Sequence, residues 1–372
     1  MRDALQNRSE IEGAEAPQPL RHSRDGLRRI SPNSSSDMTP AGAPRELRLS
    51  IAMATYNGEA YLPTQLDSLK RQSRPPNELV VSDDRSSDKT RDIVKAFAAA
   101  APFPVRLHVN ESRFGIAKNF ERAIGLCSGD VVCLADQDDL WYAHKLERID
   151  RVFTDTPSVG VMFSDADLVG ENLTPMGRTL HQCFGCPRPT NVLLTGGAEA
   201  VRVLLHERFA MFGNTLAFRS RFRDLTLPMP DEVRASYLKG FHDVWIAVLI
   251  AGIADLAILC EPLLAYRQHS GQSGSSPLRE PLRRRIERIF QAPRFPAEVS
   301  RLLCMRMKAA NGHADAVAIA SAWSHHLSVR SGLPRRRLSR VPLIGRELIA
   351  ARYHRFSNGL AAAFKDLLTV RN

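Results

Sequence analysis

In the first part of the chain, short apolar runs alternate with longer segments whose apolar residues recur every three or four positions. The short runs have the composition of buried strands, and the longer segments have the spacing of one helical face. We predict strands at Leu47–Ala54, Glu78–Val81, Val105–Val109 and Val131–Ala135, and helices at Tyr61–Leu69, Thr90–Ala100 and from Phe114 to near Cys127. Strands and helices that alternate at this pace predict an α/β fold with a parallel sheet and crossover helices.

The alternation continues less regularly in the middle of the chain. The most apolar stretch, Val244–Cys260, is short for a membrane span and carries Asp255, so a buried helix followed by a strand explains it better. The other elements that we predict here are a strand at Val159–Ser164, a turn-rich excursion at Asp165–Met176, a helix at Ala198–Glu207 and a strand at Phe212–Phe218.

The two ends of the chain differ from this folded middle, which we expect to span residues 47–278. Residues 1–46 are rich in Arg, Ser, Pro, Asn and Glu and lack apolar periodicity, so we expect a disordered extension. Residues 279–372 predict a mainly helical region, with helical patches at Leu282–Phe290, Val299–Ala310, Ala314–Val329 and Leu343–Leu368.

The net charge of +11 is unevenly placed. From Arg279 onward about 19 Lys and Arg stand against about 6 Asp and Glu, so the rest of the chain is close to neutral. Basic residues interleaved with Leu, Ile and Phe are typical of amphipathic helices on anionic lipid, which favours peripheral membrane contact. The alternative is an auxiliary helical bundle or a partner interface with solvated charges, and nothing indicates specific nucleic-acid binding.

The six cysteines are scattered, with one CxxC pair at Cys183 and Cys186. A zinc site needs further ligands, and His181 is the near candidate, so reduced cysteines explain the pattern more simply than a zinc centre. The first residues are polar and charged, without the apolar core of a signal peptide. We therefore expect a cytoplasmic protein, in peripheral contact with the inner face of the plasma membrane if the basic region binds lipid.

Polar clusters follow four of the predicted strands, and the most acidic comes after Val131–Ala135. Ligands of open α/β sheets bind outside the carboxyl ends of the strands, so we expect one ligand site there. Three carboxylates in one cluster repel one another unless a cation or ligand hydroxyls share the site, and oxygen ligands suit Mg²⁺ or Mn²⁺. Taken alone, the acidic cluster is equally explained as a solvated turn that caps the next helix. The clusters are Thr55–Asn57, Asp83–Asp84, Asn110 and Asp136–Asp139.

Two common nucleotide-binding signatures are missing from these turns. Neither GxGxxG nor GxxxxGK[ST] occurs there, which argues against a dinucleotide-binding enzyme and a P-loop ATPase. Asp243 stands ahead of the apolar helix, and its spacing alone is explained by an N-cap.

The chain resembles the family 2 glycosyltransferases with a GT-A fold, most closely their bacterial rhamnosyltransferase-like branch. Each matching group is weak alone, but their order and spacing over about 220 positions are specific. The resemblance implies a Rossmann-like, mostly parallel sheet, and it does not extend into residues 1–46 or the basic C-terminal region. The matching groups are Ala54–Gly58 with Tyr61, Leu62, Gln65 and Leu66; Ser82–Asp84 with Ser86, Asp88 and Thr90; Gly115 with Asn119 and Phe120; Asp136–Asp139 with Trp141, Lys145 and Leu146; Gly213–Thr215 with Ala217 and Phe218; His242, Asp243 and Trp245; and Tyr266–His269.

The resemblance also implies roles for single residues. Asp243 matches the general base of the family. Asp136, Asp138 and Asp139 match its DxD region, which holds the ribose and a Mn²⁺ or Mg²⁺ on the diphosphate. Asp138 and Asp139 are the candidates for the metal, although three carboxylates leave open which of them contacts it. The further nucleotide-sugar contacts that it implies are Thr55, Tyr56, Asn57, Asp83, Asp84, Lys118, Asn214 and His269.

These roles imply an inverting, metal-dependent transfer of rhamnose or a related hexose from a donor such as dTDP-rhamnose or a UDP-sugar. The acceptor would be a saccharide or a lipid-linked precursor in surface polysaccharide synthesis. One direct displacement needs a single base and no covalent intermediate, which fits one isolated Asp243. Two alternatives stay open: a nucleotidyltransferase, whose expected Gly-rich loop is missing at Thr55–Gly58, and a non-catalytic protein that binds sugar nucleotides or nucleic acid.

Overall fold

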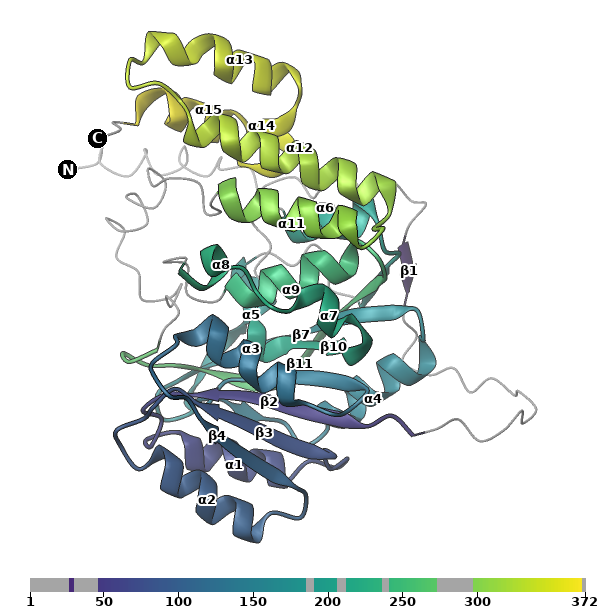
Figure 1. Ribbon diagram of the computed structural model, residues 1–372, viewed down its shortest axis with the longest axis vertical. Helices are drawn as coiled ribbons and strands as arrows, with labels where there is room; N and C mark the ends of the chain where they lie inside the picture. Colours follow the sequence, from purple (N-terminus) through teal and green to yellow (C-terminus); the bar gives the residue numbers. More distant parts are fainter. Residues whose placement is uncertain are drawn as a thin grey trace, which may run out of the picture.

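A computed structural model describes residues 27–29, 46–184, 191–205, 212–235, 241–272 and 297–369. Its centre is one sheet with the strand order β1-β9-β11-β7-β10-β5-β2-β3-β4, to which β6 is added beside β11 and β8 beside β7 (Figure 1). The strands are β1 (Leu27–Arg29), β2 (Leu49–Thr55), β3 (Glu78–Asp83), β4 (Val105–Val109), β5 (Val131–Ala135), β6 (Leu140–Trp141), β7 (Val159–Gly170), β8 (Pro175–Thr179), β9 (Val192–Leu194), β10 (Leu216–Arg219) and β11 (Asp255–Gln268).

The strands predicted from the first part of the sequence form the parallel part of the sheet. β2 pairs in parallel with β3 and β5, and β3 pairs in parallel with β4. Leu49 and Ile51 of β2 face one hydrophobic core while Ala52 faces another, as expected for a sheet that is covered on both faces. The α/β prediction is confirmed. The other half of the sheet is mixed, because β10 runs antiparallel to both β5 and β7.

Helices cover both faces of the sheet. α1, α2 and α4 pack on one face, and α3, α6 and α9 pack on the other (Figure 1). The helices are α1 (Leu62–Lys70), α2 (Thr90–Ala100), α3 (Ile116–Leu126), α4 (Lys145–Asp155), α5 (Leu180–Phe184), α6 (Ala198–Leu205), α7 (Arg223–Thr226), α8 (Asp231–Ala235), α9 (Phe241–Ala251), α11 (Ala297–Ala309), α12 (Ala314–Ser331), α13 (Val341–Ile349), α14 (Arg352–Phe356) and α15 (Gly359–Leu368).

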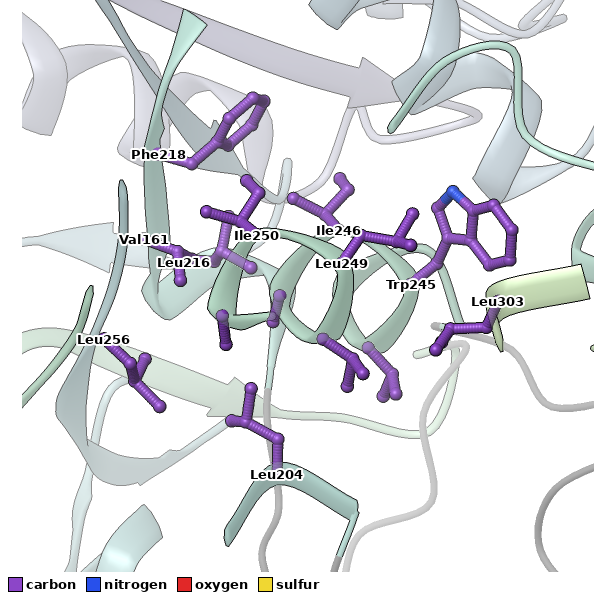
Figure 2. Close-up of a cluster of buried hydrophobic side chains, with 14 of the residues drawn as sticks. Val161, Leu204, Leu216, Phe218, Trp245, Ile246, Leu249, Ile250, Leu256 and Leu303 are labelled. Atoms are coloured by element: carbon purple, nitrogen blue, oxygen red, sulfur yellow. The ribbon is translucent and has the colours of Figure 1, made fainter. Parts of the chain in front are cut away.

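The larger of the two main cores is built around α9. All residues of α9 from Val244 onward are buried, which is expected of a helix that is apolar all round. Figure 2 shows side chains of α9 pointing toward three other elements, represented by Leu204 of α6, Phe218 of β10 and Leu303 of α11. The prediction of a buried helix followed by a strand at Val244–Cys260 is therefore confirmed.

Two strand predictions need correction. β7 continues to Gly170 instead of ending at Ser164, and it forms a hairpin with β8 where we expected a turn-rich excursion. The reason lies in Asp165 and Asp167, which resemble turn residues in the sequence but have partners within the fold. The Asp165 carboxylate accepts a hydrogen bond from the His181 amide at 2.9 Å, and Asp167 accepts one from the Tyr142 hydroxyl at 2.6 Å.

The second correction concerns Phe212–Phe218. Gly213–Thr215 forms a short 3-10 turn there, and the strand begins only at Leu216.

The C-terminal helices also differ from the prediction. The single helix expected at Leu343–Leu368 is three helices, α13 to α15, because the chain adopts left-handed backbone conformations at Ala351 and Gly359. α11 and α12 join the core around α9 through residues such as Met307 and Trp323. In the described part of the chain, no helix has both the length and the apolar composition that crossing a bilayer requires.

Leu27–Arg29 lies within the predicted disordered extension, yet it pairs with β9 as β1. The rest of residues 1–45 lies outside the described residues, as do the predicted helix Leu282–Phe290 and Cys186.

Candidate active site

Three carboxylates lie together where β5 ends. One oxygen atom from each of Asp136, Asp138 and Asp139 can be chosen so that the three atoms lie within 4.8 Å of one another. The end of β5 lies beside the end of β2, because the two strands pair in parallel. The acidic cluster therefore occupies the edge of the sheet at which the sequence predicts a ligand site.

Asp139 is the most deeply buried of the three. Its carboxylate accepts hydrogen bonds from the Asn214 side-chain amide at 2.6 Å and from the Arg267 backbone amide at 3.2 Å. Burial, followed by the charge of Asp138, raises the pKa of Asp139 to about 7, although these hydrogen bonds act in the opposite direction. Asn214 lies in the 3-10 turn Gly213–Thr215, which places its side chain at this position.

Asp138 and Asp136 are more accessible than Asp139. The Asp138 carboxylate lies 2.9 Å from Nε2 of His269, whose ring packs on Tyr61 with the ring centroids 4.4 Å apart. Within the described residues, no hydrogen bond to the Asp136 carboxylate is present. Burial and then the charges of Asp139, Asp138 and Asp243 raise the pKa of Asp136 well above its usual range.

Asp243 faces this cluster from α9. Its negative charge is one of the smaller causes that raise the pKa of Asp136. Asp243 is buried in the first turn of α9, where one of its oxygens accepts a hydrogen bond from the Val244 amide at 2.7 Å. A carboxylate at the start of a helix is also favoured by the helix dipole. The helix begins at Phe241, so Asp243 lies inside its first turn and not ahead of it.

Lys145 lies beneath the cluster, and sequence analysis gave it no role. Its ammonium group donates a hydrogen bond to the Asn214 backbone carbonyl at 2.6 Å and lies 3.8 Å from the centre of the Trp141 ring. Burial lowers the pKa of Lys145 to about 7, against the attraction of Asp139 and Asp136. The sequence indicates this burial through helical spacing: Lys145 and Ile149 are four residues apart, so they share the apolar face of α4.

A side-chain amide fixes the first loop of the site to the acidic cluster. Gln137 accepts a hydrogen bond from the Tyr56 backbone amide at 2.9 Å and donates one to the Tyr56 carbonyl at 3.1 Å. Gly58 makes room for this contact, because a Cβ atom there would lie 2.3 Å from Oε1 of Gln137. The Tyr56 ring is contacted by Arg113, whose guanidinium lies 4.0 Å from the ring centre.

The paired aspartates after β3 hold loops in place. Asp83 is buried and accepts hydrogen bonds from the Thr55 hydroxyl at 2.9 Å and the Ser86 amide at 2.9 Å. Asp84 accepts hydrogen bonds from the amides of Phe114 and Gly115, at 2.6 and 2.8 Å.

Asn57 holds the same region of the site. Its side-chain oxygen accepts a hydrogen bond from the Ser87 amide at 2.8 Å. The contacts of Asn57, Asp83 and Asp84 shape the walls of the site, and the roles that the resemblance implies for them stay predictions.

Lys118 is placed differently from the other predicted contacts. Its ammonium group lies 4.5 Å from the centre of the Phe114 ring. It lines a surface hollow of about 550 Å³ between α3 and the segment Leu227–Pro228, and none of the three clustered aspartates lines this hollow. The structure thus brings Asp136, Asp138, Asp139, Asn214, His269 and Asp243 together around one site, and it leaves Lys118 to one side.

The acidic cluster fits a divalent cation. Its donors are all oxygen atoms, which Mg²⁺ and Mn²⁺ prefer. Burial, followed by neighbouring negative charge, raises the pKa values of Asp136 and Asp139, so a bound cation would favour their ionised forms. Asp136 and Asp138 have the more accessible oxygens, whereas the oxygens of Asp139 already accept two hydrogen bonds from the protein.

Comparison with known proteins agrees with this geometry. Residues 50–225 match the sequence model of glycosyl transferase family 2. An uncharacterized glycosyltransferase of Nostoc is 32% identical over 116 residues, which are 31% of this chain and 36% of the relative. The dTDP-rhamnosyl transferase RfbG of Shigella flexneri is 38% identical over 100 residues, which are 26% and 35% of the two chains. The chain thus spans about a third of the length of these two curated relatives.

A solved structure resembles the whole fold. The crystal structure of S. aureus TarS residues 1–349 with UDP-GlcNAc superposes with a TM-score of 0.55 over 86% of this chain and 88% of that one. Because the two sequences are only 17% identical, this similarity is evidence for the fold alone. The matched region, residues 50–225, forms the parallel part of the sheet and carries the acidic edge, so this part of the chain resembles the family 2 glycosyltransferases, and the chain has the GT-A fold of the solved neighbour.

Proposed function

We propose that the protein is an inverting, metal-dependent glycosyltransferase that moves a sugar from a nucleotide diphosphate to a saccharide or lipid-linked acceptor. The observation that carries this proposal is the placement of Asp243 against the acidic cluster at the carboxyl edge of the sheet. Direct displacement needs the leaving diphosphate to be held on one side of the sugar and a base to stand on the other. In this proposal the acidic cluster, through its cation, holds the diphosphate, and Asp243 is the base.

Asp138 and Asp139, together with Asp136, are the residues that would hold Mg²⁺ or Mn²⁺. When bound, the cation supplies positive charge for the diphosphate that leaves the sugar. His269 is available beside Asp138 for a donor oxygen, and Lys145 offsets the negative charge from below. Thr55 is the last residue of β2, and Tyr56 follows it on the loop that Gln137 fixes beside the cluster, which supports nucleotide contacts at that loop.

Asp243 is the proposed general base. It removes the proton from the acceptor hydroxyl as that oxygen attacks the anomeric carbon from the face opposite the diphosphate. General-base assistance of this kind is worth about 10²–10⁴-fold in rate. No covalent intermediate forms, so the anomeric configuration is inverted.

The donor is proposed to be a dTDP- or UDP-sugar, with rhamnose or a related hexose as the transferred group. The activity in the name of the relative RfbG supports a dTDP-rhamnose donor, and the UDP-GlcNAc bound by TarS supports a UDP-sugar. The proposed acceptor belongs to surface polysaccharide synthesis, and the basic C-terminal region would act at the cytoplasmic face of the membrane that carries a lipid-linked acceptor.

The test is a screen for Mn²⁺- or Mg²⁺-dependent hydrolysis of dTDP-rhamnose and of common UDP- and GDP-sugars by the purified chain. We expect one donor to be hydrolysed slowly, with water in place of the acceptor. Asp243→Asn should keep donor binding and lose about 10²-fold or more of this turnover. Asp92→Asn is the matched control, because Asp92 lies in the first turn of α2 and is exposed. Turnover that survives in Asp243→Asn would remove Asp243 from the role of base.

A further inference from the structure

The last three helices of the described chain bury charged residues beside a small apolar core, and they also carry large apolar residues on the outside. Figure 1 places α13, α14 and α15 at one end of the molecule, beyond α12. The buried residues of this end include Arg340, Glu347 and Asp366, whereas Leu338 and Ile349 are 86% and 90% exposed. Both features are unusual for helices that face water.

The buried charges are satisfied within the protein. Asp366 accepts hydrogen bonds from the Arg330 guanidinium at 2.6 Å and from the Tyr353 hydroxyl at 2.9 Å. Glu347 lies 2.7 Å from Nδ1 of His326 and accepts a hydrogen bond from the Arg352 guanidinium at 2.6 Å. Because these groups have partners, the interior can hold them without water. The buried charged residues are therefore compatible with a stable interior at this end of the fold.

The outer side carries an apolar surface. Six of the eight large hydrophobic residues that are exposed in the described part of the chain lie here: Leu338, Val341, Ile349, Leu360, Phe364 and Leu368. We refer to these six residues as the outer apolar surface. Leu360, Phe364 and Leu368 recur every four residues on α15 and so form one stripe along that helix. Exposed apolar patches of this kind mark sites that contact another molecule or a membrane.

Within residues 333–369 the exposed charged residues are all positive. Glu347 and Asp366 are the two acidic residues between residues 333 and 369, and both are buried. The exposed arginines of the same stretch are Arg335, Arg336, Arg337, Arg346 and Arg355. Protruding apolar side chains flanked by arginine, without an exposed carboxylate, match a layer of anionic headgroups over hydrocarbon.

We propose that the outer apolar surface inserts into the interface of an anionic membrane, with the flanking arginines bound to lipid phosphates. The proposal deepens the proposed function and rests on it for its purpose, which is to hold the active site near a lipid-linked acceptor. The contact is peripheral, since it uses side chains on the outside of folded helices. It identifies which part of the basic C-terminal region meets the lipid.

The test is sedimentation of the full-length protein with vesicles of phosphatidylglycerol and phosphatidylcholine, and with phosphatidylcholine alone. We expect strong binding to the anionic vesicles, weakened by salt. The double variant Leu360→Glu and Phe364→Glu should bind at least about tenfold more weakly, because it places carboxylates on the inserted stripe. Met305→Glu is the matched control, since Met305 is 64% exposed on α11, outside the outer apolar surface, and should bind like the unchanged protein.

Binding of the double variant equal to that of the unchanged protein would overturn the proposal. So would size-exclusion chromatography showing a dimer that the double variant loses, because a second copy would then cover the surface. Circular dichroism and thermal unfolding confirm that the variants are folded. Donor hydrolysis in solution separates the two proposals: its absence with intact vesicle binding refutes the enzyme, and its presence without vesicle binding refutes the membrane contact.

Discussion

Replacing Asn214 by Leu should weaken divalent-metal binding in a way that depends on pH. The substitution keeps the approximate shape of the side chain but removes the amide that donates to Asp139 at 2.6 Å. The contact between the Lys145 ammonium and the backbone carbonyl of residue 214 does not use this side chain. The change therefore acts mainly on the charge state of Asp139.

The size of the effect follows from the hydrogen bond and from the pKa. A hydrogen bond to a charged group contributes about 1.5–3 kcal/mol, and 1.36 kcal/mol corresponds to one pKa unit. Losing the bond should raise the pKa of Asp139 from about 7 to about 8–9. A metal competes with the proton on its carboxylate site, so the apparent Kd for Mn²⁺ at pH 7 should rise by about 5- to 50-fold. At pH 9 the carboxylate is at least about half ionised in both proteins, and the difference should shrink to about twofold or less.

Isothermal titration of Mn²⁺ into the purified proteins at pH 7 and pH 9 measures this difference. Asn119→Leu is the control, because Asn119 is also a buried asparagine but donates to the Thr55 carbonyl and not to the acidic cluster. Equal Mn²⁺ affinities for Asn214→Leu and the unchanged protein at pH 7 would refute the reasoning. An equally large loss at pH 9 would also refute it, since that result would point to distorted geometry instead of protonation.

Two further predictions concern stability. Leu249→Ala in the core of Figure 2 should lower the free energy of unfolding by about 2–5 kcal/mol in urea denaturation, because the cavity lies in a fully buried helix; a loss below 1 kcal/mol would mean that the core collapses around it. Glu78→Gln should destabilise the protein by about 1–3 kcal/mol at pH 7, because Glu78 accepts hydrogen bonds from Ser50 of β2 and from Ser128, which precedes β5. These bonds hold the pKa of Glu78 at about 2, below its usual 4.5, so this stabilisation is present above pH 4.5 and is lost as the pH falls toward 2. A difference between the two proteins that stays constant from pH 7 to pH 3 would contradict this assignment.

The sequence predicted the parallel part of the sheet and the edge that carries the site. Strands such as Val105–Val109 and Val131–Ala135 have the same bounds in the structure, because local composition and helical spacing decide these elements. The polar clusters after the strands met at one edge because parallel strands end on the same side. These features are local or follow from topology alone.

The remaining features depend on contacts between distant segments. Asp165 looked like a turn residue until the fold gave it the His181 amide, 16 residues away, as a partner. Helical spacing places Lys145 on the apolar face of α4, but the fold alone supplies the hydrogen-bond partner of its ammonium group, the carbonyl of Asn214, 69 residues away. The break between α13 and α14 depends on a left-handed conformation at Ala351, a residue type that favours continued helix.

β11 determines the smallest piece of this chain that can be expected to fold. The region that matches the family ends at residue 225, but β11 begins at Asp255 and pairs in parallel with β7 along most of its length. A fragment that ended at residue 225 would lose α9 as well, and it would leave the 12-residue strand β7 without this partner. Long unpaired strand edges invite pairing with other chains, so such a fragment is expected to aggregate. Expression fragments of this chain should therefore run at least through Gln268.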